Sequence, residues 1–141
     1  MTEAYDSNNI FAKILRGEIP SHRVYEDEHT VAFMDVMPQG TGHTLVLSKA
    51  PSRNLLDADP ATLGRLMQTV QRIARAVKQA FAADGVMIVQ YNEAASGQTI
   101  YHLHVHVIPR FADVPLKPHT GKMEDQQVLA TNAEKVRRAL A

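Results

Sequence analysis

A long amphipathic segment between Asp59 and Gly85 constrains the fold of this chain more than any other feature. Asp59 followed by Pro60 is typical of a helix start, because aspartate caps the first turn and proline fits the first helical position. Apolar residues then recur at helical spacing, and Gly85 follows them as a predicted helix stop. The positions that we expect to face a core are Leu63, Leu66, Met67, Val70, Ile73, Ala74, Val77 and Phe81.

Strand-like runs with short connections surround this helix, and they define the fold class. The runs are residues 22–27, 30–35, 43–48, 86–92 and 98–109. Because short connections favour antiparallel pairing, we predict an α+β fold with a single five-stranded antiparallel sheet. A short N-terminal helix over residues 9–17 and the long central helix are expected to pack against this sheet, and residues 125–140 are compatible with a closing helix.

Composition limits the classes of function. The chain has 141 residues, which indicates one domain, and its 15 basic and 15 acidic residues give no reason to expect a nucleic-acid or membrane-surface partner. It has no cysteine, which excludes disulfides and thiolate metal sites. The start MTEAYDSNN lacks the pattern of a signal peptide, and no apolar run approaches the length of a membrane span. We therefore expect a cytoplasmic protein.

Three histidines alternate with aliphatic residues in the run YHLHVHVIPR, residues 101–110. Alternate side chains of a strand point to opposite faces, so His102, His104 and His106 are predicted to share one face. The aliphatic residues between them are predicted to meet the helices, which means that the histidine face is not expected to be core. Three solvated histidines on an open sheet face would be the simplest interpretation.

A metal site is a second interpretation, since imidazole is a common zinc ligand. Alternate residues of a strand lie about 6.6 Å apart, which places His102 and His106 roughly 13 Å apart. All three histidines could therefore share one zinc ion only by bending inward. We predict that no metal and no other cofactor is required.

Phosphate chemistry is the third interpretation. One neutral imidazole can attack phosphorus, while a neighbouring one holds the phosphate oxygens as charge builds up. The loop sequence SGQT, residues 96–99, precedes the histidines and supplies a glycine and two polar side chains.

The run HLHVHVI, with GQT before it and Asn92 at the end of the previous strand, resembles the signature of the histidine-triad (HIT) superfamily. The resemblance covers residues 9 to about 111, including NIFAKILRGEIPSHRVYED and AFMDVMPQGTGHTLVLSK. It implies a single HIT domain over residues 1–141, with a core of about residues 9–111 and a C-terminal extension of residues 112–141. The family's fold agrees with the order of elements predicted above.

The resemblance also implies roles for individual residues. His104 would be the nucleophile that forms a nucleotidyl-histidine, and His106 would contact the phosphate oxygens. His102 would be a polar support, linked with His43 in the hydrogen-bond network around the nucleophile. Asp35 would bind the ribose hydroxyls. Further substrate contacts would come from the polar residues Asn92, Gly97, Gln98 and Thr99, and from an apolar base pocket of Phe11, Ile14, Phe33 and Leu45.

The activity implied is hydrolysis at the α-phosphorus of purine nucleoside 5′-phosphoramidates or related adenylates. Dinucleoside polyphosphate hydrolysis is an alternative, and a nucleotide-binding or scaffold protein with incidental catalysis is another. Some relatives carry a Cys-x-x-Cys pair that helps to bind zinc, whereas Asn9 and Ala12 stand at those positions here. Family members pair about a two-fold axis, and the run VMIVQYN would otherwise be an exposed sheet edge, so we also predict a homodimer.

Overall fold

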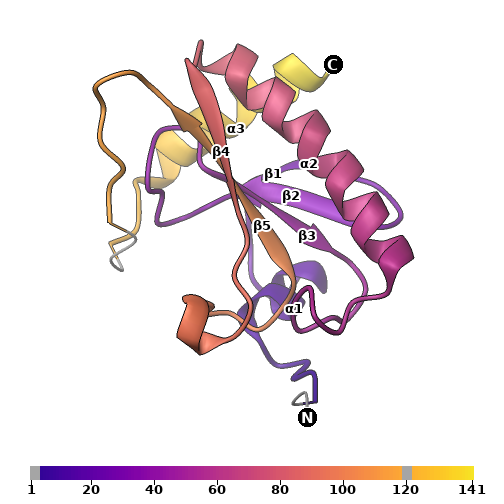
Figure 1. Ribbon diagram of the computed structural model, residues 1–141. Helices are drawn as coiled ribbons and strands as arrows, with labels where there is room; N and C mark the ends of the chain where they lie inside the picture. Colours follow the sequence, from indigo (N-terminus) through magenta and orange to yellow (C-terminus); the bar gives the residue numbers. More distant parts are fainter. Residues whose placement is uncertain (1–3, 119–121) are drawn as a thin grey trace.

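The computed structural model describes residues 4–118 and 122–141 of the chain. It contains a five-stranded antiparallel sheet with the strand order β1-β2-β3-β5-β4, which confirms the predicted fold class. The strands are β1 (Arg23–Glu26), β2 (Thr30–Met34), β3 (Thr44–Ser48), β4 (Gly85–Val89) and β5 (His104–Arg110). The helices are α1 (Ile10–Leu15), α2 (Pro60–Ala80), α3 (Gln126–Leu140) and a short 3-10 turn, η1 (Ala94–Ser96) (Figure 1).

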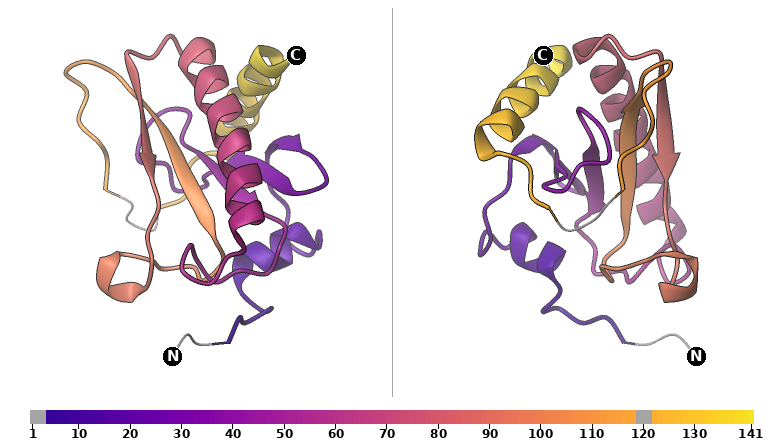
Figure 2. Two further views of the ribbon diagram at one scale, coloured as in Figure 1. Left: turned by 45° about the vertical axis from the view of Figure 1, so that its right-hand side comes forward. Right: turned by 90° about the vertical axis from the view of Figure 1, so that its left-hand side faces the viewer.

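Two apolar clusters lie on opposite faces of the sheet. On one face, Val46, Val105 and Val107 pack with buried residues of α2 and α3. On the other face, Phe11 and Ile14 of α1 pack with a smaller cluster of sheet residues. Both views of Figure 2 show α3 beside α2, and α1 apart from α3, near the N terminus of the chain. The sheet is therefore covered on both faces, by two long helices on one and partly by a short helix on the other.

Helix α2 starts as predicted, because the Asp59 side chain accepts a hydrogen bond from the Ala61 N–H and Pro60 occupies the first turn. Its end differs from the prediction. Ala82 takes up the left-handed conformation, with φ +49°, whereas the predicted stop, Gly85, opens β4. Met67 was predicted to be core, but 51% of it is exposed, since the buried face of α2 runs through Thr69 and Val70 instead.

The turn before β3 packs against the end of α2. Gly42 has φ +84°, and a Cβ atom at this position would lie 2.5 Å from Cε2 of the Phe81 ring. Both the backbone conformation and the close approach therefore require glycine. This contact fixes the PQGTG turn, which leads directly into His43.

Strand β5 begins six residues later than predicted, at His104 rather than Gln98. His102 therefore lies in a bend before the strand and outside the sheet ladder. The histidine face is also not open to solvent: His102 is fully buried, and only 8% each of His104 and His106 is exposed. The interpretation as three solvated histidines is therefore excluded, because Phe11 of α1 packs against His104 and Tyr5 of the N-terminal segment bonds to His102.

The C-terminal extension packs against the rest of the chain. The Asp125 side chain caps α3, and Leu129, Ala133 and Val136 of this helix are buried in the larger apolar cluster. The compatible helix over residues 125–140 is therefore present. Within the described part of the chain, no helix combines the length and apolar character that crossing a membrane requires.

Candidate active site

A cavity of about 370 Å³ opens on the face of the sheet opposite α2 and α3. Ten of the predicted site residues line it: Phe11, Ile14, Phe33, Asp35, Leu45, Gly97, Gln98, Thr99, His104 and His106. Three others do not line it, namely His43, His102 and Asn92. The fold thus gathers residues from α1, the end of β2, β3, the loop after η1 and β5 around one space.

The imidazole of His104 is oriented by the backbone two residues before it. Its Nδ1 lies 2.6 Å from the carbonyl oxygen of His102, and a carbonyl can only accept a hydrogen bond. Nδ1 therefore carries the proton, and in the neutral ring the lone pair lies on Nε2. Phe11 packs edge-on against this ring, with 4.8 Å between ring centroids. The arrangement fixes the tautomer that a nitrogen nucleophile needs.

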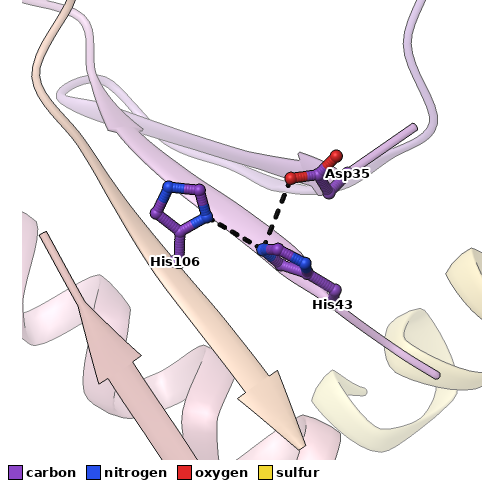
Figure 3. A group of neighbouring side chains, drawn as sticks. All are labelled: Asp35, His43 and His106. Atoms are coloured by element: carbon purple, nitrogen blue, oxygen red, sulfur yellow. Dashed lines mark hydrogen bonds and ion pairs between the residues drawn. The ribbon is translucent and has the colours of Figure 1, made fainter. Parts of the chain in front are cut away.

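His106 is oriented by a chain of hydrogen bonds that starts in the turn before β3. The N–H of Gln39 donates to Nδ1 of His43 at 3.0 Å, so the proton of neutral His43 lies on Nε2. That nitrogen lies 2.9 Å from Nδ1 of His106 (Figure 3). If His43 donates this bond, His106 accepts at Nδ1 and carries its own proton on Nε2. His106 is then a hydrogen-bond donor, the opposite role to that of His104.

Asp35 belongs to the same network. Its Oδ1 accepts the N–H of Met37 at 2.8 Å, and its Oδ2 lies 3.4 Å from Nε2 of His43. The side chain is only 5% exposed, although the residue lines the cavity. Figure 3 shows the carboxylate and His106 both directed toward the ring of His43. Asp35 thus has a contact with His43 in addition to its predicted one with ribose.

His102 is held at both ring nitrogens, but not by His43 as predicted. Its Nε2 donates to the carbonyl of Ser48 at 2.7 Å, and its Nδ1 accepts the hydroxyl of Tyr5 at 2.6 Å. Burial lowers the pKa of His102, and the bond to Ser48 offsets only part of this effect. His102 is therefore neutral, and the link with His43 in the network was predicted wrongly, because β3 brings His43 to His106 instead.

Hydrogen bonds to buried polar groups hold the loop that carries Gly97, Gln98 and Thr99. The amide of Gln98 accepts hydrogen bonds from the N–H of Glu93 and from Asn54, and it donates to the carbonyls of Arg53 and Ile100. Its polar atoms are thus engaged within the protein, so Thr99, which is exposed, is better placed to contact a ligand.

An ion pair supports the same loop. Arg53 binds both carboxylate oxygens of Glu93, at 2.8 and 2.9 Å, and its guanidinium lies 4.0 Å from the ring centroid of Tyr101. The bond from Arg53 lowers the pKa of Glu93. Glu93 has φ +73° and Gly97 has φ +112°, so two residues of this short loop have a left-handed φ. These contacts hold a loop conformation that is otherwise unfavourable.

Asn92 does not face the cavity. Its side-chain oxygen accepts the N–H of Leu55 and the amide of Gln90, and its Nδ2 donates back to Gln90. These bonds tie the end of β4 to the loop before α2. In this geometry Asn92 therefore supports the backbone around the site. It does not make the predicted contact with the substrate.

Sequence reasoning missed several residues that build the site. Tyr91 lines the cavity and packs edge-on against His106, with 5.7 Å between ring centroids. Gln39 orients His43 through its backbone N–H, which no side-chain pattern can reveal. Tyr5 and the pair Arg53–Glu93 act across sequence separations of 97 and 40 residues. Tyr91 and Glu93, on either side of Asn92, and Gln39, within the PQGTG turn, lay close to recognised motifs, but their contacts did not follow from them.

One group among the described residues has the ligand types for a metal ion, namely Asp35, His43 and His106. Their candidate ligand atoms all lie within 4.8 Å of one another. A metal on Nε2 of His43 would require the proton to move to Nδ1, but that nitrogen accepts the N–H of Gln39. The hydrogen bonding of this group therefore does not fit a zinc site. At the positions of the Cys-x-x-Cys pair, the side chain of Asn9 instead caps α1 by accepting the N–H of Ala12.

Comparisons with known proteins agree with this geometry. Residues 16–113 match the HIT domain. A Hit-like protein from Bartonella henselae superposes with a TM-score of 0.94 at 57% identity, covering 98% of this chain and 100% of that one. A zinc-bound histidine triad family protein from Mycobacterium smegmatis superposes with a TM-score of 0.84 at 33% identity, covering 94% and 93%. The adenylylsulfatase HINT3 of Arabidopsis thaliana is 32% identical over 123 residues, which are 83% of this chain and 62% of that protein.

Proposed function

The chain belongs to the HIT family, and from this membership we propose that it hydrolyses purine nucleoside 5′-phosphoramidates or related adenylates at the α-phosphorus. Members of the family hydrolyse or bind nucleotides. The observation that carries the finer proposal is the hydrogen bond from Nδ1 of His104 to the carbonyl of His102. It assigns the lone pair to Nε2 of a histidine that lines the cavity.

In the first chemical step, Nε2 of His104 attacks the α-phosphorus and forms a nitrogen–phosphorus bond. The bond between phosphorus and the leaving group breaks, and the leaving group departs with the electron pair and takes up a proton from the solvent, which is returned when the attacking water loses a proton in the second step. Water then attacks the phosphorus of the nucleotidyl-histidine, which releases the 5′-nucleotide and restores the imidazole. His106, as a donor at Nε2, stabilises the negative charge that develops on the phosphate oxygens in both steps.

The rest of the cavity suits a nucleotide. Phe11, Ile14, Phe33 and Leu45 form an apolar wall that can take a purine base, although each of them also belongs to the smaller apolar cluster. Asp35 lines the same cavity and lies next to His43, which is compatible with its predicted contact to the ribose hydroxyls. Gly97 and Thr99 line the cavity as well, together with His104 and His106, and could contact the phosphate.

Dinucleoside polyphosphate hydrolysis is the second candidate activity, since it needs the same nucleophile and differs in the leaving group. The name of the Arabidopsis relative, an adenylylsulfatase, favours adenylates with a small leaving group. A nucleotide-binding protein with incidental catalysis would retain the cavity but turn over every substrate slowly.

The deciding experiment ranks kcat/KM over a panel of adenylate and guanylate conjugates that differ in the leaving group, with pyrimidine conjugates for comparison. The proposal predicts that phosphoramidates and simple adenylates rank above dinucleoside polyphosphates, and that adenosine or guanosine ranks above pyrimidine conjugates. A first rank for dinucleoside polyphosphates would support the second activity. Uniformly slow turnover with tight nucleotide binding would support a binding protein.

We also propose that the protein is a homodimer joined through β4. This strand lies at the edge of the sheet, and 43% of its residue Ile88 is exposed. An exposed apolar edge strand favours pairing with a second copy. Sedimentation at micromolar concentration should give the mass of a dimer, and a monomer there would reject this assembly.

A further inference from the structure

The segment before α1 reaches the histidines through a single side chain. Tyr5 is half-buried, and its hydroxyl lies 2.6 Å from Nδ1 of His102. The two rings also pack edge-on, with 5.7 Å between centroids and an angle of 68° between planes. Because His102 is fully buried, its Nδ1 would lose this hydrogen bond without the hydroxyl of Tyr5. A buried acceptor left unsatisfied is destabilising, so the contact is a strong constraint on the ring.

The other ring nitrogen of His102 fixes its protonation state. Nε2 lies 2.7 Å from the carbonyl of Ser48, which requires a proton on that nitrogen. With the lowered pKa that burial causes, the ring is neutral, so Nδ1 must be an acceptor. A hydroxyl is the matching donor. The bonds from Tyr5 and to Ser48 therefore define one tautomer and one orientation of His102.

The backbone of His102 transmits this orientation to His104. The peptide between His102 and Leu103 lies before β5, and it is held from one side by the Leu103 N–H, which donates to the carbonyl of Ser52 at 2.9 Å. The carbonyl of the same peptide accepts Nδ1 of His104 at 2.6 Å. The side chain of His102 thus anchors the residue whose carbonyl selects the tautomer of the nucleophile.

We propose that Tyr5 is a positioning residue for His104. Its hydroxyl holds His102 in place, and His102 in turn holds the carbonyl that keeps Nε2 of His104 nucleophilic and aligned. This inference rests on the proposed function, because it assumes that His104 attacks phosphorus. It gives the N-terminal segment a part in catalysis, although Tyr5 does not line the cavity.

The test compares two variants that each delete one tyrosine hydroxyl. Tyr5→Phe keeps the ring and removes the bond to His102. Tyr25→Phe is the matched control, since the Tyr25 hydroxyl also donates a partly buried hydrogen bond, to Asp27 at 2.8 Å, but lies on β1 outside the site. In single-turnover experiments with labelled substrate, Tyr5→Phe should slow formation of the nucleotidyl-enzyme roughly 10- to 100-fold, as expected for a displaced catalytic group. The Kd for mononucleotide should stay within about twofold, because the binding cavity is intact.

A double-mutant cycle separates positioning from packing. If Tyr5 acts through His102, then Tyr5→Phe should slow the His102→Leu variant no further. The variant His102→Gln keeps a donor for Ser48 and an acceptor for Tyr5, so it should fold and remain sensitive to Tyr5→Phe, which covers the case that His102→Leu does not fold. The ¹⁵N signals of the His102 ring should report a proton on Nε2 in the wild type and a shifted Nδ1 in Tyr5→Phe, whatever the activity.

These measurements distinguish two failures. A wild-type protein that forms no nucleotidyl-histidine overturns the proposed function and the role of Tyr5 with it. An active wild type whose labelling rate is unchanged by Tyr5→Phe overturns the role of Tyr5 alone. Additive effects in the cycle would also overturn it, since Tyr5 would then act independently of His102.

Discussion

On the helix-covered face of the sheet, Val46, Val105 and Val107 are buried among aliphatic side chains of α2 and α3. On the opposite face, beside the smaller apolar cluster, the histidines are oriented by individual hydrogen bonds, as His106 is by His43 and His104 by the carbonyl of His102. Many weak contacts hold the first face, and each of them can be lost at moderate cost. The polar groups of the second face depend on individual directional bonds, and among the described residues no buried side-chain nitrogen or oxygen lacks a partner. The larger apolar cluster therefore lies on one face of the sheet, and the candidate catalytic histidines lie on the other.

The largest effect that should separate the two faces is that of His104→Ala on turnover. Loss of a nucleophile typically lowers kcat by about 10⁴-fold or more, because the covalent route disappears. The fold should persist, since the large apolar cluster lies on the other face. Steady-state kinetics and calorimetric binding of mononucleotide would measure both properties on the same sample. The trapped label on wild-type protein should be acid-labile and base-stable, as expected for a nitrogen–phosphorus bond.

Substantial turnover by His104→Ala, or a trapped label on another residue, would contradict this assignment. The histidines would then act by general acid–base catalysis on water, and the lone pair on Nε2 of His104 would accept a proton and not attack phosphorus.

His106→Ala should have a smaller effect on the same face. The variant removes one donor to the phosphate oxygens, which by analogy with the loss of one oxyanion donor raises the barrier by about 3–4 kcal/mol. The nucleophile remains, so a slow burst of nucleotidyl-enzyme should still be visible in single-turnover experiments. A loss as complete as that of His104→Ala would instead indicate that the two histidines act as one unit.

Ile73→Ala tests the helix-covered face. Ile73 lies on α2, is fully buried and belongs to the large apolar cluster. Truncation of such a residue to alanine typically lowers the free energy of unfolding by about 2–5 kcal/mol through lost burial and a residual cavity. Chemical denaturation would measure the loss, and kcat/KM of the remaining folded protein should be unchanged. If the variant is fully folded and still loses most of its kcat/KM, packing on the helix-covered face affects the geometry of the active site.

The two faces also differ in how far the sequence predicts them. Periodicity places the apolar residues of α2 correctly apart from Met67, because burial of a helix stripe follows from spacing alone. The same rule fails for the histidines, since alternation predicts a shared strand face but not that α1 covers it. The histidine motif identifies His104 and His106 as cavity residues through the family resemblance.

The partners of these histidines cannot be predicted in the same way. The bond from Tyr5 to His102 joins positions 97 residues apart, and the bond from Gln39 to His43 uses a backbone N–H. Neither has a local pattern, because each depends on how distant segments meet in the folded chain. Asn92 shows the reverse case, a residue of the expected type at the expected place whose amide serves the scaffold instead.

A carboxylate outside the site should affect stability alone, by a modest amount. Burial raises the pKa of Asp27, but hydrogen bonds from the His29 N–H, the Tyr25 hydroxyl and Thr30 outweigh it and lower the pKa from 3.8 to about 2. A lowered folded-state pKa stabilises the fold above the unfolded-state value, and the stabilisation is lost as the pH falls from about 4 through about 2. Asp27→Asn should therefore lower the free energy of unfolding at pH 7 by about 1 kcal/mol after allowance for solvent screening.

The difference between Asp27→Asn and wild type should shrink in denaturation experiments as the pH approaches 2, and kcat/KM at pH 7 should not change. A difference that is constant across this pH range would mean that the asparagine acts through shape and not through charge.

The smallest expected effect is that of chelation, which should leave kcat/KM unchanged. The relative from Mycobacterium smegmatis is zinc-bound, so the test concerns a real property of a similar protein. Here the chain has no cysteine, and Nε2 of His43 and Nδ1 of His106 are 2.9 Å apart, at hydrogen-bond distance. Two ligand atoms on a tetrahedral zinc with bonds of about 2.05 Å would lie roughly 3.3 Å apart, and His43 would also have to give up its bond from Gln39. Activity that is lost on exhaustive dialysis against a chelator, and restored by zinc but not by magnesium, would show that Asp35, His43 and His106 bind a metal after all. Unchanged activity, together with metal analysis of the dialysed protein, would leave hydrogen bonds as the forces that orient the histidine face.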